Sequence, residues 1–299
     1  MTSGILLVDK PQGVTSHDVV ARARRLLGTR KVGHAGTLDP MATGLLLLGV
    51  DSATRLLTYL VGLDKEYTAT IRLGIATDTD DAEGAVVATR DASGVADADI
   101  ARGIAALTGR IAQRPSTYSA IKVDGRRAYD RARAGEEVEL VARPVTIHAF
   151  DLLSTRRTGE AIDLDVRVAC SSGTYIRALA RDLGADLGVG GHLTALRRTR
   201  IGPFSVADAV TLPDPREHPD AAPPPLRDPA SVAQELFPVV RLDEAKTRDV
   251  AHGKRVELAA PDVELAAALT PDGRLAALVE LRRGRLRVLL GLPTQEVLP

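Results

Sequence analysis

The chain has 299 residues, enough for one large domain and a small one, and its 44% hydrophobic and 26% charged residues are typical of a soluble globular protein. Its single cysteine, Cys170, excludes an internal disulfide and suits a reducing compartment. No apolar run is as long as a membrane span, and the N-terminal segment lacks the basic start and the apolar length of a signal peptide. We therefore expect a cytoplasmic protein that does not contact membranes.

The formal net charge is zero, but the charges are unevenly distributed. Residues 110–133 contain seven bases and two acids, a net charge of +5, whereas residues 70–100 contain two bases and seven acids, a net charge of −5. This asymmetry permits a basic face for a polyanion and an acidic face elsewhere. Ordinary solvated surface is the alternative.

The first part of the chain predicts both strands and helices. Residues 5–9 have the pattern of a short buried strand. Ser16 is a candidate N-cap of a helix that Gly28 ends. Strands are expected at residues 67–73 and 86–89, followed by a helix that Asp97 caps and Gly109 ends.

Residues 161–170 alternate strictly between apolar and polar side chains, which is the pattern of a half-buried strand. A Ser-Ser-Gly-Thr segment then leads into a helix whose apolar face runs from Ile176 to Leu187. These elements do not follow a regular βαβ order, so we predict an α+β fold with a mixed, mostly antiparallel sheet.

Eight of the seventeen prolines fall between Pro213 and Pro238, which marks a linker. We therefore assign residues 1–212 to a catalytic domain, 213–238 to a Pro-rich linker with a short helix, and 239–299 to a small β-rich domain. In the last of these, strands are expected at residues 239–242, 275–282 and 286–292.

The segment 33–44, GHAGTLDPMATG, places one carboxylate among three glycines and a proline. Asp39 precedes Pro40, which favours an extended backbone at Asp39. A carboxylate nucleophile must be fixed, partly shielded from water and reachable, and a loop of this kind beside an apolar run meets those needs. The alternative is a structural turn in which Asp39 accepts backbone hydrogen bonds.

Tyrosines and an arginine provide further candidates. Tyr67, Tyr118 and Tyr175 lie in charge-bearing segments of a chain that has only eight aromatic residues of the Phe and Tyr types. Such rings can stack on bases, with core packing as the alternative. Arg177 opposes the helix dipole at the start of its helix, so we expect a carboxylate partner such as Asp39, unless the side chain faces solvent.

Other chemistries lack their motifs. The sequence contains no Walker A or GxGxxG loop, no HExxH, no Cys/His cluster and no GxSxG elbow. We therefore expect neither a cofactor nor a metal.

Seven segments in order resemble the bacterial tRNA pseudouridine-55 synthases of the TruB type. They are residues 6–20, 31–48, 65–84, 119–136, 142–147, 170–184 and 192–204. The C-terminal part resembles that family's PUA-like RNA-binding domain. The resemblance implies a pseudouridine synthase fold and isomerisation of uridine at position 55 in the TΨC loop of tRNA, by base flipping and an aspartate-dependent exchange of a C–N for a C–C glycosidic bond.

The resemblance also implies residue roles. Asp39 matches the nucleophile, Tyr67 the tyrosine that stacks on uracil, and Arg177 the arginine that pairs with the aspartate. The expected substrate-binding residues are His34, Tyr175, Leu196 and Lys10. Residues 110–140 match a basic insertion that closes on the RNA stem-loop, and the expected RNA-binding residues are Lys122, Arg126, Arg127, Arg197 and Arg198.

The expected partner is the tRNA T stem-loop, bound by a monomer without a protein partner. Three alternatives stay open at this point. They are a base-removing glycosidase, which usually needs a second carboxylate, a pseudouridine synthase for another RNA, and a non-catalytic RNA-binding or RNA-folding module.

Overall fold

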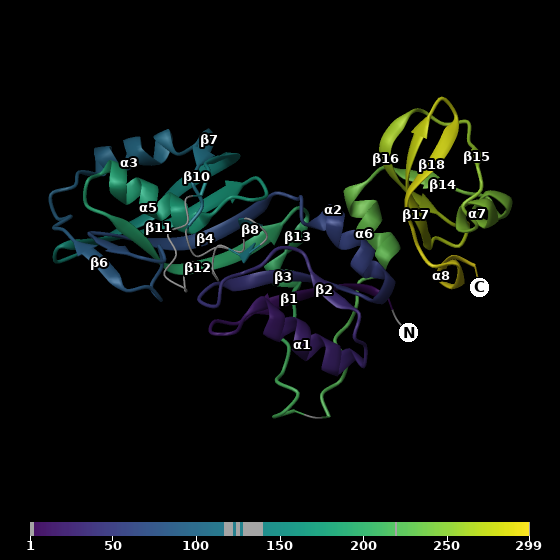
Figure 1. Ribbon diagram of the computed structural model, residues 1–299, viewed down its shortest axis with the longest axis horizontal. Coiled ribbons are helices and arrows are strands. Elements are labelled where there is room, and N and C mark those ends of the chain that lie inside the picture. Colours follow the sequence, from purple (N-terminus) through teal and green to yellow (C-terminus); the bar gives the residue numbers. More distant parts are fainter. Residues whose placement is uncertain (1–2, 117–121, 124–125, 128–139, 219, 299) are drawn as a thin grey trace.

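A computed structural model describes residues 3–116, 122–123, 126–127, 140–218 and 220–298 (Figure 1). Within these residues the larger sheet has the strand order β1-β3-β12-β4-β11-β10-β7, with β2 added to β3 and β13 to β12. Its pairs are antiparallel apart from the parallel β3–β12 pair. The strands are β1 (Gly4–Lys10), β2 (Val32–His34), β3 (Thr43–Val50), β4 (Lys65–Leu73), β7 (Gly109–Gln113), β10 (Arg143–Thr158), β11 (Ala161–Cys170), β12 (Gly191–Ile201) and β13 (Phe204–Ser205).

Helices cover this sheet, and two small hairpins extend it. The helices α3 and α5 pack on the half formed by β4, β10 and β12, while the apolar side of α1 packs on β1, β2 and β3. The hairpins pair β5 with β6 and β8 with β9. These elements are α1 (Ser16–Leu27), η1 (Asp51–Leu56), α2 (Leu57–Leu60), α3 (Asp97–Ala106), α5 (Ile176–Asp186), η2 (Val206–Asp208), β5 (Ile75–Thr77), β6 (Val86–Thr89), β8 (Lys122–Val123) and β9 (Arg126–Arg127).

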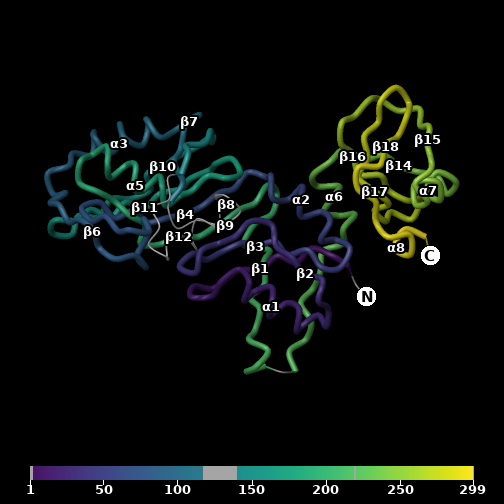
Figure 2. Tube along the Cα trace, in the orientation of Figure 1, coloured from purple at the N-terminus to yellow at the C-terminus, as the bar shows by residue number. Residues whose placement is uncertain are grey.

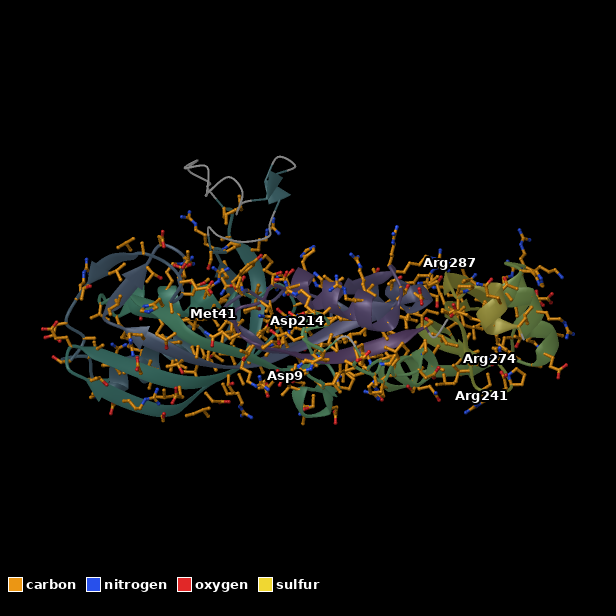
Figure 3. All side chains as sticks on the ribbon, turned by 90° about the horizontal axis from the view of Figure 1, so that it is seen from below. Asp9, Met41, Asp214, Arg241, Arg274 and Arg287 are labelled. Atoms are coloured by element: carbon orange, nitrogen blue, oxygen red, sulfur yellow. The ribbon has the colours of Figure 1, made fainter. Side chains whose placement is uncertain are left out.

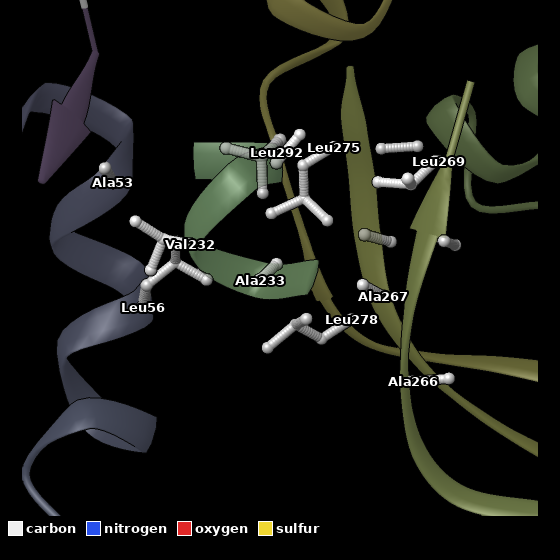
Figure 4. Packing of buried hydrophobic residues seen from close by; sticks show 14 of the residues in the cluster. Ala53, Leu56, Val232, Ala233, Ala266, Ala267, Leu269, Leu275, Leu278 and Leu292 are labelled. Atoms are coloured by element: carbon white, nitrogen blue, oxygen red, sulfur yellow. The ribbon is translucent and has the colours of Figure 1, made fainter. Parts of the chain in front are cut away.

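The C-terminal part is a second sheet of order β14-β16-β17-β18-β15. It shares one hydrophobic core with the large sheet, because Leu56 on η1 and Leu278 on β17 both belong to the cluster that contains Val232 on α6 (Figure 4). Its elements are α6 (Pro229–Leu236), β14 (Val239–Arg241), α7 (Glu244–Ala251), β15 (Val256–Glu257), β16 (Val263–Leu269), β17 (Leu275–Arg282), β18 (Arg285–Gly291) and α8 (Thr294–Val297). The predicted α+β fold with a mostly antiparallel sheet and a small β-rich part is confirmed.

The Pro-rich segment after η2 contains no helix or strand before α6 among its described residues, and it extends beyond α1 as a long loop (Figure 2). It is nevertheless attached to the large sheet, since Ile5 exchanges backbone hydrogen bonds with Arg227 and Leu7 accepts one from Val210. The division of the chain at residues 213–238 stays a prediction.

Two predicted caps are wrong by one residue. Thr15, not Ser16, is the N-cap of α1, where it forms a capping box with Asp18, and Gly28 ends the helix with a positive φ of 63° as expected. Ala96, not Asp97, is the N-cap of α3, which ends at Ala106 before Gly109. The hydroxyl of Ser16 is thereby free to make a different contact, described below.

None of the helices in the described ranges is long and apolar enough to cross a membrane.

Side chains project along the whole length of the molecule, with Asp9 and Met41 over the large sheet and Arg241, Arg274 and Arg287 on the C-terminal part (Figure 3).

Candidate active site

The loop between β2 and β3 carries Asp39, and contacts from two other segments hold it in place. The Ser16 hydroxyl accepts a hydrogen bond from the Leu38 N–H at 2.9 Å and donates one to the Leu38 carbonyl at 3.1 Å. The N–H of Gly13 donates to the Pro40 carbonyl at 2.9 Å. The residues on either side of Asp39 are therefore fixed to the N-terminal segment.

Lys10 supports the same loop from beneath. Its side chain is fully buried, and its Nζ donates to the carbonyls of Val14 at 2.7 Å, Pro11 at 3.0 Å and Pro40 at 3.2 Å. Burial lowers the pKa of Lys10 to about 8, although nearby Asp39 opposes the change. A side chain with no exposed surface and three carbonyl partners positions the loop, and the expected contact of Lys10 with substrate stays a prediction.

The ion pair predicted between Arg177 and Asp39 is present. Arg177, in the first turn of α5, places its Nε 3.0 Å from Asp39 Oδ2. The Arg177 side chain is 6% exposed, whereas that of Asp39 is 38% exposed. Desolvation raises the pKa of the Asp39 carboxyl and Arg177 opposes this rise. Asp39 is therefore a carboxylate that is held on one side and open on the other.

A second carboxylate, which the sequence did not reveal as part of the site, holds the other side of Arg177. Arg177 Nη1 lies 3.2 Å from Asp81 Oδ2 and donates to the Thr79 carbonyl at 2.9 Å. Asp81 is 3% exposed, and its Oδ1 accepts hydrogen bonds from the Thr79 hydroxyl and the Glu83 N–H. The expected acidic face is therefore partly wrong, since Asp81 lies inside the site and the neighbouring Asp80 pairs with Arg181 at 3.2 Å.

Asp39 opens into a cavity of about 300 Å³, at the small end of the range for pockets that bind small molecules. Tyr67, Tyr175 and Leu196, all predicted to contact the substrate, line it together with Asp39 and Arg177. With Arg198, described below, the structure thus brings six of the predicted residues to one place. Asp39 is the only carboxylate among the described residues that line this cavity.

Tyr67 and Lys65 project from β4 on the same face. Tyr67 is 8% exposed, and burial raises the pKa of its hydroxyl. Lys65, which sequence reasoning missed, donates from Nζ to the carbonyls of Val61 and Leu63, each at 2.6 Å, and to the Ser172 hydroxyl at 3.1 Å. The alternation of β4 could have identified it, because Lys65 shares the buried face of Tyr67. Lys65 ties together two segments of the cavity wall, and burial lowers its pKa to about 8.

The two neighbouring arginines of β12 differ. Arg197 is 40% exposed and pairs with Asp9 at 2.7 Å, so it stays a candidate for phosphate contact. Arg198 is 2% exposed, and its Nε and Nη2 donate to the carbonyls of Leu45 at 2.7 Å and Gly36 at 3.1 Å. Arg198 lies in the cavity wall rather than on the surface, and its expected contact with RNA stays a prediction.

His34 ends β2, next to the Asp39 loop, and its ring packs edge-on against His17 with centroids 5.8 Å apart. It is not among the residues that line the cavity, and burial lowers its pKa. Tyr118 lies outside the described residues, as do the side chains of Lys122, Arg126 and Arg127. Within the described ranges, no group of three or more His, Cys, Asp or Glu side chains is arranged to hold a metal ion.

Comparison with protein families decides the assignment. Residues 24–176 match the model of the TruB family pseudouridylate synthase N-terminal domain, which contains Asp39 and Tyr67. The chain belongs to the TruB family of pseudouridylate synthases. The TruB assignment extends to the rest of the chain, because residues 177–217 match the tRNA pseudouridylate synthase B C-terminal domain and residues 237–293 match the tRNA pseudouridine synthase II C-terminal model. The chain is therefore an RNA-modifying isomerase.

Curated relatives and solved structures agree with the TruB assignment. The tRNA pseudouridine synthase B of Leifsonia xyli is 60% identical over 99% of this chain and 98% of its own length. That of Paenarthrobacter aurescens is 56% identical over 93% and 91%. A structure described as a Cbf5-Nop10-Gar1 complex has a TM-score of 0.71 at 27% identity and covers 98% of this chain and 86% of the matched chain. The predicted fold type and enzyme class are confirmed.

Proposed function

We propose that this enzyme isomerises uridine to pseudouridine at position 55 of tRNA, with Asp39 as the reacting carboxylate. One observation carries the proposal. A carboxylate fixed by Arg177 at 3.0 Å opens into a small cavity that Tyr67 also lines. We propose that this cavity receives a single flipped-out base. The curated relatives that match this chain over nearly their full length are named tRNA pseudouridine synthase B, which supports tRNA as the substrate.

The reaction breaks the N1–C1′ bond, turns the uracil, and forms a bond from C5 to C1′. Three first steps use Asp39: attack on C1′, attack on the uracil ring, or removal of the 2′ proton. Each requires the ionised carboxylate, so the Arg177 contact serves all three. When C5 bonds to C1′ it carries one hydrogen too many, which leaves as a proton while N1, now free of the sugar, takes one up. We assign help in removing the C5 proton to the Tyr67 hydroxyl.

The target uridine must leave its loop to reach Asp39. Unstacking a base costs roughly a few kcal/mol, and stacking on an aromatic ring such as Tyr67 returns about 1–3 kcal/mol per base. Phosphate contacts supply the rest. We assign these contacts to Lys122, Arg126, Arg127 and Arg197, and we assign uridine contacts to His34, Tyr175 and Leu196.

A base-removing glycosidase is disfavoured by the site. Such enzymes usually combine a nucleophile with an acid, but Asp81, the second carboxylate that Arg177 contacts, does not line the cavity. We assign the T stem-loop as the bound element of tRNA, a monomer as the active form, residues 1–212 as the catalytic domain and 239–299 as an RNA-binding domain.

The test is tritium release from unmodified tRNA labelled at C5 of uridine. We expect one equivalent per tRNA from the wild type and none from Asp39→Asn, which should still bind RNA. Changing uridine 55 to cytidine should abolish release at that site. Release from the cytidine-55 tRNA would refute the position, turnover by Asp39→Asn would refute the role of Asp39, and free uracil among the products would indicate a glycosidase.

A further inference from the structure

The register of the large sheet places Arg198 directly beside the reacting groups. In the antiparallel pair of β4 and β12, Arg198 lies opposite Tyr67 and Leu196 lies opposite Ala69. Residues two apart on a strand share a face, so Leu196, Arg198 and Tyr67 all face the cavity, whereas Arg197 points to the other side of the sheet.

Backbone carbonyls hold the Arg198 guanidinium, and no carboxylate neutralises it. Its guanidinium donates to the carbonyls of Leu45 on β3 and Gly36 in the Asp39 loop, and it forms no ion pair within the described ranges. A buried cation without a counter-ion is costly. Because a guanidinium stays protonated at any ordinary pH, the cavity wall carries a permanent positive charge.

The positive charge of Arg198 acts on the pKa values of the surrounding groups in the direction expected of a cation. Burial raises the pKa of the Asp39 carboxyl and of the Tyr67 hydroxyl, and Arg198 opposes both rises. Burial lowers the pKa of the Lys65 ammonium, and Arg198 adds to that lowering. Its charge is therefore felt on both sides of the space that the uracil would occupy.

We infer that Arg198 is a further catalytic residue, whose guanidinium stabilises negative charge on the uracil while that base is detached from, or partly bonded to, the sugar. The inference rests on the proposed function. In all three routes open to Asp39, an electron pair moves onto the uracil ring: with the broken C1′–N1 bond in two of them, and through addition of the carboxylate in the third. The pair spreads to the ring carbonyl oxygens and is used again when C5 bonds to C1′.

This charge exists only during the reaction, so a cation that contacts the ring favours the transition state over the bound substrate. The rigid anchoring of Arg198 adds to the effect, because its orientation is already set when the charge develops. The Arg198 contact to Gly36 also connects this charge to the loop that carries Asp39. The same side chain is thus placed to contact the ring and to fix the loop.

Three variants separate charge from structure. Arg198→Gln retains amide donors for the carbonyls but removes the charge, Arg198→Lys keeps the charge with fewer donors, and Arg200→Met is the matched control. Arg200 is an exposed arginine of the same strand without an ion pair among the described residues. The measurements are single-turnover tritium release at saturating tRNA, the tRNA Kd of each protein, its thermal unfolding, and the pH dependence of the single-turnover rate.

We expect Arg198→Gln to lower the saturated rate by about 10²- to 10³-fold, the range for losing one group that stabilises developing charge, with a Kd close to that of the wild type. The saturated rate of Arg198→Lys should be at least tenfold higher than that of Arg198→Gln, and the rate of Arg200→Met should match that of the wild type. The acid limb of the pH–rate profile should lie at higher pH for Arg198→Gln than for the wild type, because the pKa of Asp39 rises when the cation is removed.

Four results would overturn the inference. A raised Kd with an unchanged saturated rate would make Arg198 a phosphate contact, and equal losses in the Gln and Lys variants with lowered unfolding temperatures would make its role structural. A wild-type enzyme that releases no tritium from tRNA would instead refute the proposed function, and the inference with it. A fully active Arg198→Gln beside an active wild type would refute the inference alone.

Discussion

Replacing Lys10 by Met should lower the catalytic rate by displacing the Asp39 loop, not by removing a contact with the substrate. Lys10 Nζ is the donor for the carbonyls of Pro11, Val14 and Pro40, and the last of these adjoins Asp39. Methionine has a similar shape but no donor, so three buried carbonyls lose their partner. We expect the Asp39 loop to shift, and a misplacement of about 1 Å at a reacting group costs on the order of 10²-fold in rate.

The stability change follows from two opposing terms. Each unsatisfied buried carbonyl costs about 1–3 kcal/mol, so the three together cost about 3–9 kcal/mol. Removing the buried charge returns about 3 kcal/mol, the equivalent of a pKa lowered from 10.5 to about 8. The net destabilisation is therefore centred near 3 kcal/mol, small enough for the variant to fold.

Single-turnover rates at saturating tRNA, together with urea unfolding and the tRNA Kd, measure these effects. Lys31→Met, which removes an exposed lysine that follows α1, is the control and should behave as the wild type in rate and stability. The reasoning is refuted if Lys10→Met unfolds at a lower urea concentration but keeps the wild-type rate. It is equally refuted if the loss appears only in Kd, since Lys10 would then contact RNA.

Three further predictions follow from the same geometry. Gly44→Ala should unfold at markedly lower urea concentration and lose activity, because φ is +100° there and a Cβ would lie 2.3 Å from the Arg198 carbonyl oxygen; a wild-type urea midpoint would contradict the close approach of β3 to β12. Arg177→Met should move the acid limb of the pH–rate profile to higher pH, because Arg177 opposes the desolvation that raises the pKa of Asp39; an unmoved limb would show that another group controls it. Lys65 has a folded pKa of about 8, below its unfolded value of 10.5, so between these pH values the unfolded chain binds more protons and stability rises with pH. The unfolding free energy of the wild type relative to Lys65→Met should therefore increase from pH 8 to pH 10.5, by up to about 3 kcal/mol, and a constant difference in urea unfolding would refute the shift.

The sequence predicted best the elements whose signal is local. The strand β11 begins and ends at the predicted residues because its side chains alternate without interruption. The Arg177–Asp39 ion pair was also predicted, because a cation in the first turn of a helix needs a carboxylate partner and the segment around Asp39 had already singled out that carboxylate. The N-cap of α1 failed by one residue because Thr15 and Ser16 both carry a hydroxyl, and only the fold decides which of them caps the helix.

Asp81 was missed because no motif around it singles it out. It lies in a run of acids that reads as solvated surface, and the chain brings it to Arg177, 96 residues away, only when the segment after β5 packs beside β12. Nothing in the residues around Asp81 distinguishes it from exposed neighbours such as Asp97 or Asp99. Identifying it requires the tertiary contact itself.

The basic residues show why charge alone does not identify function in this chain. Lys10, Arg177 and Arg198 are all buried, but their charges meet different partners. Arg177 pairs with carboxylates, so its charge fixes and ionises Asp39. Lys10 and Arg198 meet backbone carbonyls, which orient a cation without cancelling its charge. A cavity with one carboxylate and a permanent cation next to an aromatic ring is suited to a reaction in which negative charge passes from a carboxylate to a base and back, and that balance of charge, more than any single motif, connects this fold to uridine isomerisation.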